Sequence, residues 1–123
     1  LTNHIRFFDF VSESEKYNLL SRSWVLLHPS LHEGWGLNVI EANLVGTPAI
    51  GYNISGLQDS IQDGKTGLLT FVNSPDGLAE AMHRLVSDTK KLSLFSKNAL
   101  IWSKQFNWDQ TAKECLVFIK KYG

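Results

Sequence analysis

The sequence predicts an α/β fold, in which a parallel β-sheet is flanked by helices as in half of a doubly wound sheet. Short apolar runs alternate with amphipathic stretches, which is typical of strand–helix units on a parallel sheet. The run at residues 24–28 is nearly all apolar, as expected for a strand buried on both faces. Beyond residue 74 only helical spacing of apolar residues remains, so the last elements are expected to be helices.

Four strands are expected, and the residues between them predict where helices begin and end. Ser12 followed by Glu15 is a capping-box pattern, and Ser74 followed by Pro75 is typical of a helix start. Gly46 suits the left-handed residue that follows a helix. The expected strands are residues 5–11, 24–28, 48–52 and 67–71, and the expected helices are residues 13–22, 36–45, 57–61, 75–86, 92–106 and 108–119.

Several aromatic and sulfur side chains are expected to pack inside the fold. Trp24 and Trp102 are interpreted as core residues, and Cys115 as a small hydrophobe on the apolar face of the last helix. This single cysteine excludes an intrachain disulfide framework and a multi-cysteine metal site, and it favours a reducing, cytoplasmic compartment.

The composition is that of an ordinary globular domain and excludes several classes of protein. The chain has 123 residues and is 43% hydrophobic, which is enough for one core and too short for two domains. Its 12 Lys and Arg balance 12 Asp and Glu, which argues against a nucleic-acid-binding surface. No apolar stretch reaches the roughly 18 residues of a membrane span.

The two ends of the chain add two expectations. Leu1 is not a starter Met and no signal-peptide core follows it, so we expect a piece of a longer protein. From Arg84 onward eight Lys or Arg residues stand against three Asp or Glu. We interpret this end as a solvated helical surface; a basic face for anionic lipid or a partner domain is the alternative, which leaves peripheral membrane contact open.

Residues 32–42 carry the pattern that predicts chemistry. Gly34 and Gly36 lie where a strand-end loop meets a helix N-terminus, whose free N–H groups and partial positive charge suit a phosphate. Glu33 lies just before this helix and Glu41 lies within it, roughly 7–8 Å further along at 1.5 Å per residue. Carboxylates suit vicinal hydroxyls because they accept two hydrogen bonds. The layout matches a nucleotide sugar, with hydroxyls on both sides of a diphosphate.

Simpler interpretations exist for the same residues. Taken singly, Glu33 and Glu41 are ordinary surface acids near a helix. His28 and His32 are four residues apart, but Pro29 excludes the helix that would align them, so no metal site is expected. A glycoside hydrolase would also use paired carboxylates, but the glycine-rich helix start between them favours transfer from a nucleotide sugar.

The chain resembles the retaining GT-B glycosyltransferases of family 4. Their Glu-x7-Glu signature is matched at residues 29–48 by PSLHEGWGLNVIEANLVGTP. Further matches occur at FVS (10–12), SGLQD (55–59), DGKTGLL (63–69) and FNW (106–108), so the likeness covers nearly the whole chain. Asn38 stands where the family often has Pro, Ser55 where it has Gly, and Trp35 where it has Phe.

The resemblance implies a Rossmann-like parallel sheet with flanking helices, part of the C-terminal donor-binding domain of a GT-B fold. Residues 1–123 would then be a single partial domain, without the N-terminal acceptor domain and the first strand–helix units. It also implies retaining transfer of a hexose from a UDP- or GDP-linked sugar to a glycan or lipid acceptor, without a metal or other cofactor. The fragment alone would be inactive.

The resemblance also implies roles for individual residues. Glu33 would be the catalytic residue that contacts donor-sugar hydroxyls, and Glu41 would bind the ribose. The backbone of Val11 would lie near the nucleobase, and the sugar and diphosphate would be bordered by Gly34, Trp35, Gly36 and Leu37.

Two alternative functions remain open. A sugar-nucleotide epimerase of related fold would use the same kind of donor site. A non-catalytic binding module would be expected to lose Glu33 or Glu41, and both are present.

Overall fold

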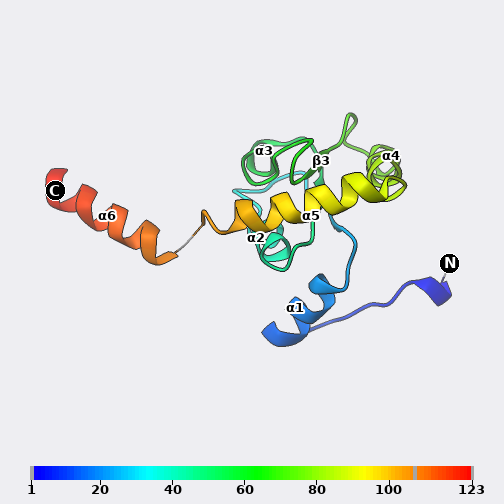
Figure 1. Cartoon of the computed structure of the whole chain (residues 1–123), viewed down its shortest axis with the longest axis horizontal. Coiled ribbons are helices and arrows are strands. Elements are labelled where there is room, and N and C mark those ends of the chain that lie inside the picture. The colour runs from blue at the N-terminus through cyan, green and yellow to red at the C-terminus, as the bar shows by residue number, and fades with distance from the viewer. Residues whose placement is uncertain (1, 107, 123) are drawn as a thin grey trace.

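The computed structural model of the chain describes residues 2–106 and 108–122 (Figure 1). Helices and strands alternate up to residue 69, and the elements that follow are all helices. The elements are the 3-10 helix η1 (Thr2–His4), α1 (Glu13–Ser21), β1 (Leu26–His28), α2 (Leu37–Leu44), β2 (Ala49–Gly51), α3 (Ser55–Ser60), β3 (Gly67–Leu69), α4 (Pro75–Val86), α5 (Thr89–Ser103) and α6 (Trp108–Tyr122).

The sheet has three parallel strands in the order β1-β2-β3. In the middle of the ladder, Leu27 of β1 is opposite Ile50 of β2, which in turn is opposite Leu68 of β3. Consecutive strands are joined by a helix, as a parallel sheet requires. The predicted parallel sheet with flanking helices is therefore confirmed.

The core lies on both faces of the sheet. Since successive residues of a strand point to opposite faces, Ala49 and Ile50 enter different clusters, and both are fully buried. One cluster packs the sheet against α2 and α3, and the other packs it against α4 and α5. The first contains Val39, Ala49, Leu57, Ile61 and Leu69, and the second contains Ile50, Leu68, Ala81, Leu85 and Phe95.

Hydroxyl caps begin two helices where the sequence predicts them. Ser12 Oγ accepts a hydrogen bond from the Glu15 N–H at 3.2 Å. Ser74 Oγ accepts one from the Gly77 N–H at 3.0 Å, with Pro75 in the first position of α4. Gly46 has a φ of 80°, which confirms the predicted left-handed residue after α2.

The prediction of a strand at residues 5–11 is wrong. The segment has no regular structure, and the side chains of Phe7 and Phe10 are 92% and 93% exposed. A strand is stable only when its backbone groups pair with a neighbour, and no backbone pairing involves this segment within the described ranges. Figure 1 shows the N-terminal segment running away from the sheet.

Two predictions of burial are also wrong, for the same reason. Trp24, just before β1, is 67% exposed. The predicted last helix is present as α6, but Cys115 and the apolar side chains around it are exposed, and α6 stands apart from the sheet in Figure 1. Helical spacing predicts an apolar face and not the partner that covers it. Trp102 is half-buried and donates its indole N–H to the Ser60 carbonyl at 2.8 Å.

Within the described ranges, no helix combines the length and the apolar character needed to cross a bilayer.

Candidate functional site

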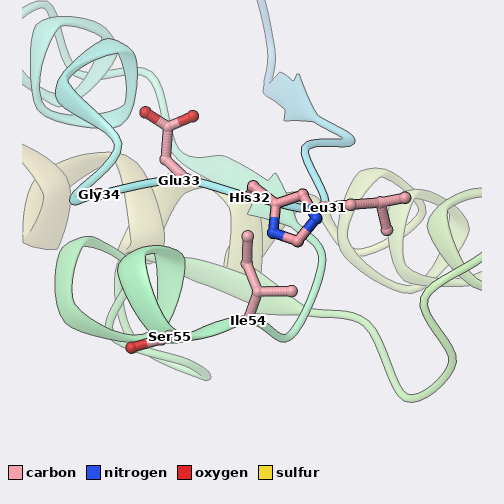
Figure 2. Close-up of a pocket in the computed structure, with 6 residues that line it drawn as sticks. All are labelled: Leu31, His32, Glu33, Gly34, Ile54 and Ser55. Atoms are coloured by element: carbon pink, nitrogen blue, oxygen red, sulfur yellow. The ribbon is translucent and has the colours of Figure 1, made fainter.

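An open pocket of about 450 Å³ lies beyond the carboxyl ends of the strands, where ligands bind in open α/β sheets. Its walls come from the loop after β1 and from the start of α3 (Figure 2). The lining residues are Leu31, His32, Glu33, Gly34, Ile54 and Ser55. Two of the predicted site residues, Glu33 and Gly34, thus lie in the wall of one pocket.

The carboxylate of Glu33 is partly buried and lies near a histidine. Its side chain is 31% exposed, and Oε2 lies 3.8 Å from His28 Nε2 at the end of β1. Figure 2 shows the carboxylate pointing away from Ile54 and Ser55. The described residues hold no group of three His, Cys, Asp or Glu side chains that could ligate a metal ion.

Gly56 fixes the loop that carries Glu33, and the sequence reasoning missed this role. A Cβ built on Gly56 would lie 2.0 Å from the Glu33 carbonyl oxygen and 2.9 Å from the Gly34 carbonyl carbon. The start of α3 therefore packs directly on the backbone of the loop. The Gly-Leu pair at residues 56–57 belongs to a family motif in the sequence, but no local pattern indicates which backbone it contacts.

Gly36 directly precedes α2, in a conformation that favours glycine. Its φ is 77°, and a Cβ there would lie 2.8 Å from both Leu57 Cδ2 and Ser60 Oγ. Glycine is thus needed for the backbone and for packing on α3, in addition to the close approach to a ligand that the sequence predicts.

The N-terminus of α2 is left without a side-chain cap. Within the described residues no side chain caps it, and no acidic residue lies in its first turn, whereas Ser12 and Ser74 cap α1 and α4. The Val39 N–H donates to the Gly36 carbonyl at 2.9 Å, so the N–H groups of Leu37 and Asn38 are the ones left for an anion. They carry the partial positive charge of the helix end.

Glu41 lies one turn further along α2 and is joined to α1. Its side chain is 16% exposed, and Oε2 lies 2.8 Å from the Lys16 ammonium. Lys16 also lies 3.2 Å from Glu13 Oε1. Hydrogen bonding to Glu41, and secondly to Glu13, raises the pKa of Lys16 above its usual 10.5. Lys16 precedes Glu41 by many residues, so spacing alone does not reveal the pair.

The pocket is not lined by the other predicted site residues, which are Gly36, Glu41, Trp35, Leu37 and Val11. The Trp35 ring packs edge-to-face on Phe106, with centroids 4.7 Å apart. Leu37 is 46% exposed in the first position of α2, and Val11 is half-buried just before α1. The contacts with a ligand that the sequence predicts for Trp35, Leu37 and Val11 stay predictions.

The loops after β2 and β3 are joined by a polar clamp, defined here as Asn53 and Asn73. Asn73 Oδ1 accepts from the Asn53 N–H at 2.7 Å, and Asn73 Nδ2 donates to the Asn53 carbonyl at 3.1 Å. Thr70 Oγ1 donates to the same Asn73 oxygen at 2.8 Å. The clamp holds the chain just before Ile54 and Ser55, which line the pocket.

Comparison with known proteins gives the family. The family model described as glycosyl transferases group 1 matches residues 1–102. The chain belongs to this family. This match confirms the resemblance at the level of glycosyl transferases group 1.

Curated relatives in this family include D-inositol 3-phosphate glycosyltransferases. The one from Corynebacterium urealyticum is 30% identical over 114 residues, which cover 93% of this chain and 27% of the relative. The one from Streptomyces bingchenggensis is 33% identical over 108 residues, which cover 88% of this chain and 24% of the relative. The chain therefore spans about a quarter of the length of these relatives.

Solved structures share the fold. Sucrose-phosphate synthase from Thermosynechococcus elongatus is 28% identical with a TM-score of 0.88, over 97% of this chain and 30% of that chain. Anabaena HepE, in complex with UDP and glucose, has a TM-score of 0.86 over 97% of this chain and 32% of that one. At 23% identity the second likeness concerns the fold alone. These neighbours are GT-B glycosyltransferases, so the predicted Rossmann-like GT-B fold class is confirmed.

Proposed function

We propose that this chain is the donor-binding part of a retaining glycosyltransferase, within the C-terminal domain of a GT-B fold. The whole protein would transfer a hexose from a UDP- or GDP-linked sugar to a glycan or lipid acceptor. One observation carries the proposal: Glu33 lines the pocket beyond the strand ends, and the uncapped start of α2 and then Glu41 follow it along the chain.

The order of these groups along α2 matches the order of groups in a nucleotide sugar. Glu33 and Gly34 lie in the pocket wall before the helix. Leu37 begins the helix, and Glu41 lies roughly 6 Å further along its axis at 1.5 Å per residue. Along the chain, the protein offers a hydrogen-bond acceptor at Glu33, donors at the helix start and a second acceptor at Glu41. A nucleotide sugar fits this order, with its sugar hydroxyls at Glu33, its diphosphate at the helix start and its ribose hydroxyls at Glu41.

The chemical role of the site would be orientation and charge stabilisation. The N–H groups at the start of α2 would stabilise the negative charge that develops on the departing diphosphate. Glu33 would orient the sugar through its hydroxyls, and the acceptor would attack the same face from which the diphosphate leaves. Glu33 is not proposed as a nucleophile, and neither a metal nor another cofactor is part of the proposal.

The rest of the machinery would lie elsewhere in a longer protein. The relatives are about four times as long as the matched segment, which supports a separate acceptor domain. The complex of the similarly folded HepE with UDP and glucose supports a nucleotide-sugar donor for this fold. We propose a cytoplasmic location for the whole protein, with peripheral membrane contact through the basic C-terminal end as the alternative to a solvated surface.

An amide-resolved NMR titration of the chain with UDP, GDP and ADP and with their glucose or mannose conjugates tests the proposal. We expect shifts at Gly34–Glu41 and near Val11 with one base only. Equal weak shifts with all three nucleotides, or shifts confined to another face, would contradict the donor site.

Gly34→Ala separates a ligand effect from a stability effect. A Cβ at this position meets no protein atom within 4 Å, and the φ of Gly34 is not positive. The variant should therefore keep the thermal midpoint of the wild-type chain. If the sugar or the diphosphate approaches the backbone here, its affinity for the nucleotide sugar should fall about tenfold or more, because the new methyl group occupies ligand space. Unchanged affinity would place the donor elsewhere.

Glu41→Ala distinguishes an enzyme donor site from a binding module of the same fold. Under the proposal it weakens nucleotide binding, since it removes the acceptor for the ribose hydroxyls. A module that binds another ligand through another face would keep that affinity.

A further inference from the structure

Lys16 is a charged residue of α1 that contacts the predicted site on α2. Its ammonium lies 2.8 Å from Glu41 Oε2 and 3.2 Å from Glu13 Oε1. The two carboxylates differ in exposure, since the Glu41 side chain is 16% exposed and the Glu13 side chain is 83% exposed. An ion pair that is sheltered from water has more effect than an exposed one.

Glu41 needs this partner to keep its carboxylate where it is. Oε2 has no access to solvent, and a carboxylate oxygen removed from water needs a compensating partner. The ammonium of Lys16 supplies it and restricts the side-chain torsions that would otherwise turn the carboxylate into water. Because Lys16 occupies Oε2, Oε1 is the oxygen left to accept hydrogen bonds from a ligand.

A hydrogen bond outside the ion pair also holds α1 beside α2. Thr47, in the loop between α2 and β2, donates its hydroxyl to the Leu20 carbonyl in α1 at 2.6 Å. The α1 helix is thus fastened near its end by Thr47 and near its start by the Lys16–Glu41 pair. Two separate contacts therefore hold α1 in place, and with it the backbone of Lys16.

We propose that Lys16 is a positioning residue for ribose recognition, which holds Oε2 of Glu41 and thereby presents Oε1 to the ribose hydroxyls of a nucleotide. The inference rests on the proposed role of Glu41 and deepens it. Lys16 touches the carboxylate and not the sugar. Its removal therefore lowers the preference for ribose and leaves the binding of base and diphosphate intact.

The test compares a nucleoside diphosphate with its 2′,3′-dideoxy analogue. The probe is whichever of UDP, GDP and ADP binds the wild-type chain most tightly, and affinities are measured by NMR titration. We expect the wild-type chain to prefer the ribonucleotide by about tenfold, as for hydrogen bonds to a charged group. In Lys16→Met this preference should fall below about threefold, with unchanged affinity for the dideoxy analogue.

Two variants serve as matched controls. Lys16→Arg keeps the charge and should restore the preference for ribose. Glu13→Gln removes only the exposed partner of Lys16 and should leave the preference as in the wild-type chain. Amide spectra of all variants establish that the fold is kept.

The outcomes separate this inference from the proposed function. A wild-type chain that prefers ribose, with an equal preference in Lys16→Met, overturns the role of Lys16 and leaves the donor site standing. Equal loss of affinity for both probes in Lys16→Met also overturns it, because it indicates a structural or diphosphate-binding role. A wild-type chain that shows no preference contradicts the proposed role of Glu41 itself.

A second measurement tests the ion pair without any nucleotide. Lys16 should give a slowly exchanging ¹⁵N-ammonium signal that disappears in Glu41→Gln and persists in Glu13→Gln. The absence of this signal from the wild-type chain would overturn the inference even if no nucleotide binds.

Discussion

Gly56→Ala is the substitution that most directly tests how the candidate site is built. The new methyl group would lie 2.0 Å from the Glu33 carbonyl oxygen and 2.7 Å from its carbon. Ordinary contacts of a Cβ begin at 3.4 Å, so the loop and α3 must separate by about 1.4 Å. Both partners are backbone atoms, which rules out relief by the rotation of a side chain.

The expected cost of this change exceeds its benefit. Alanine in place of glycine favours a helix by up to about 1 kcal/mol, and Gly56 has no positive φ that would oppose the change. Overpacking of a buried site costs about 1–3 kcal/mol, and the rigid backbone here favours the upper end. We therefore expect the free energy of unfolding to fall by about 2 kcal/mol net, and the thermal midpoint by roughly 8 °C for a domain of this size.

Thermal unfolding followed by circular dichroism, with Gly34→Ala as the control, is the assay. Both substitutions add the same methyl group, and only the one at Gly56 meets protein atoms. Amide shifts at Glu33 and Gly34 should accompany the loss of stability, because the strain acts on this loop. A Gly56→Ala midpoint within 2 °C of the Gly34→Ala midpoint would refute the reasoning about this contact.

Three further predictions concern the contacts around the site. Asn73→Ala removes both hydrogen bonds to the Asn53 backbone, so the free energy of unfolding should fall by about 1–3 kcal/mol in urea titrations. Thr47→Val leaves the Leu20 carbonyl without its 2.6 Å donor; hydrogen exchange in α1 should accelerate more than exchange in β2. The raised pKa of Lys16 means that its stabilising charge is complete below pH 10.5 and is lost as the pH rises through the higher folded value. The stability difference between wild type and Lys16→Met should thus be constant from pH 7 to 9 and shrink above pH 10.5, as urea titrations at each pH will measure.

The sequence predicts those parts of the fold that depend on local pattern. The strand centres at residues 26–28, 49–51 and 67–69 follow from short apolar runs between turn signals. The caps at Ser12 and Ser74 depend on residues only three positions apart. Such signals are complete within one turn or one strand, so they can be interpreted without knowledge of the rest of the chain.

Predictions failed where the outcome depends on a partner. Residues 5–11 have the apolar content of a strand, and no described strand pairs with them. Trp24 and the apolar face of α6 around Cys115 have the composition of core residues and remain exposed. Apolar character determines what a segment can bury, and only the neighbouring elements determine whether it is buried.

The residues of the candidate site also fall into those that a local pattern reveals and those that depend on a partner. The spacing of Glu33, Gly36 and Glu41 is visible in the sequence because all three lie on one loop and one helix. Lys16 and Gly56 come from other elements, and their contacts arise only when α1 and α3 pack beside α2. The sequence thus predicts candidate ligand-binding groups, whereas the groups that hold them in place are found only from the structure.

The two ends of the site are held by different helices, and this has a testable consequence. Gly56 of α3 supports the backbone of Glu33, and Lys16 of α1 supports the carboxylate of Glu41. None of the contacts described for one pair includes a residue of the other, and independent sites have additive effects within about 0.5 kcal/mol. In a double-mutant cycle of Gly56→Ala and Lys16→Met, the losses in binding free energy for a nucleotide sugar should therefore add. Gly56→Ala should lower the affinity for the nucleotide sugar more than for the free nucleotide, and Lys16→Met should lower both equally. A coupling energy above about 1 kcal/mol would show that α2 transmits strain between its ends, and the site would then have to be treated as one rigid unit.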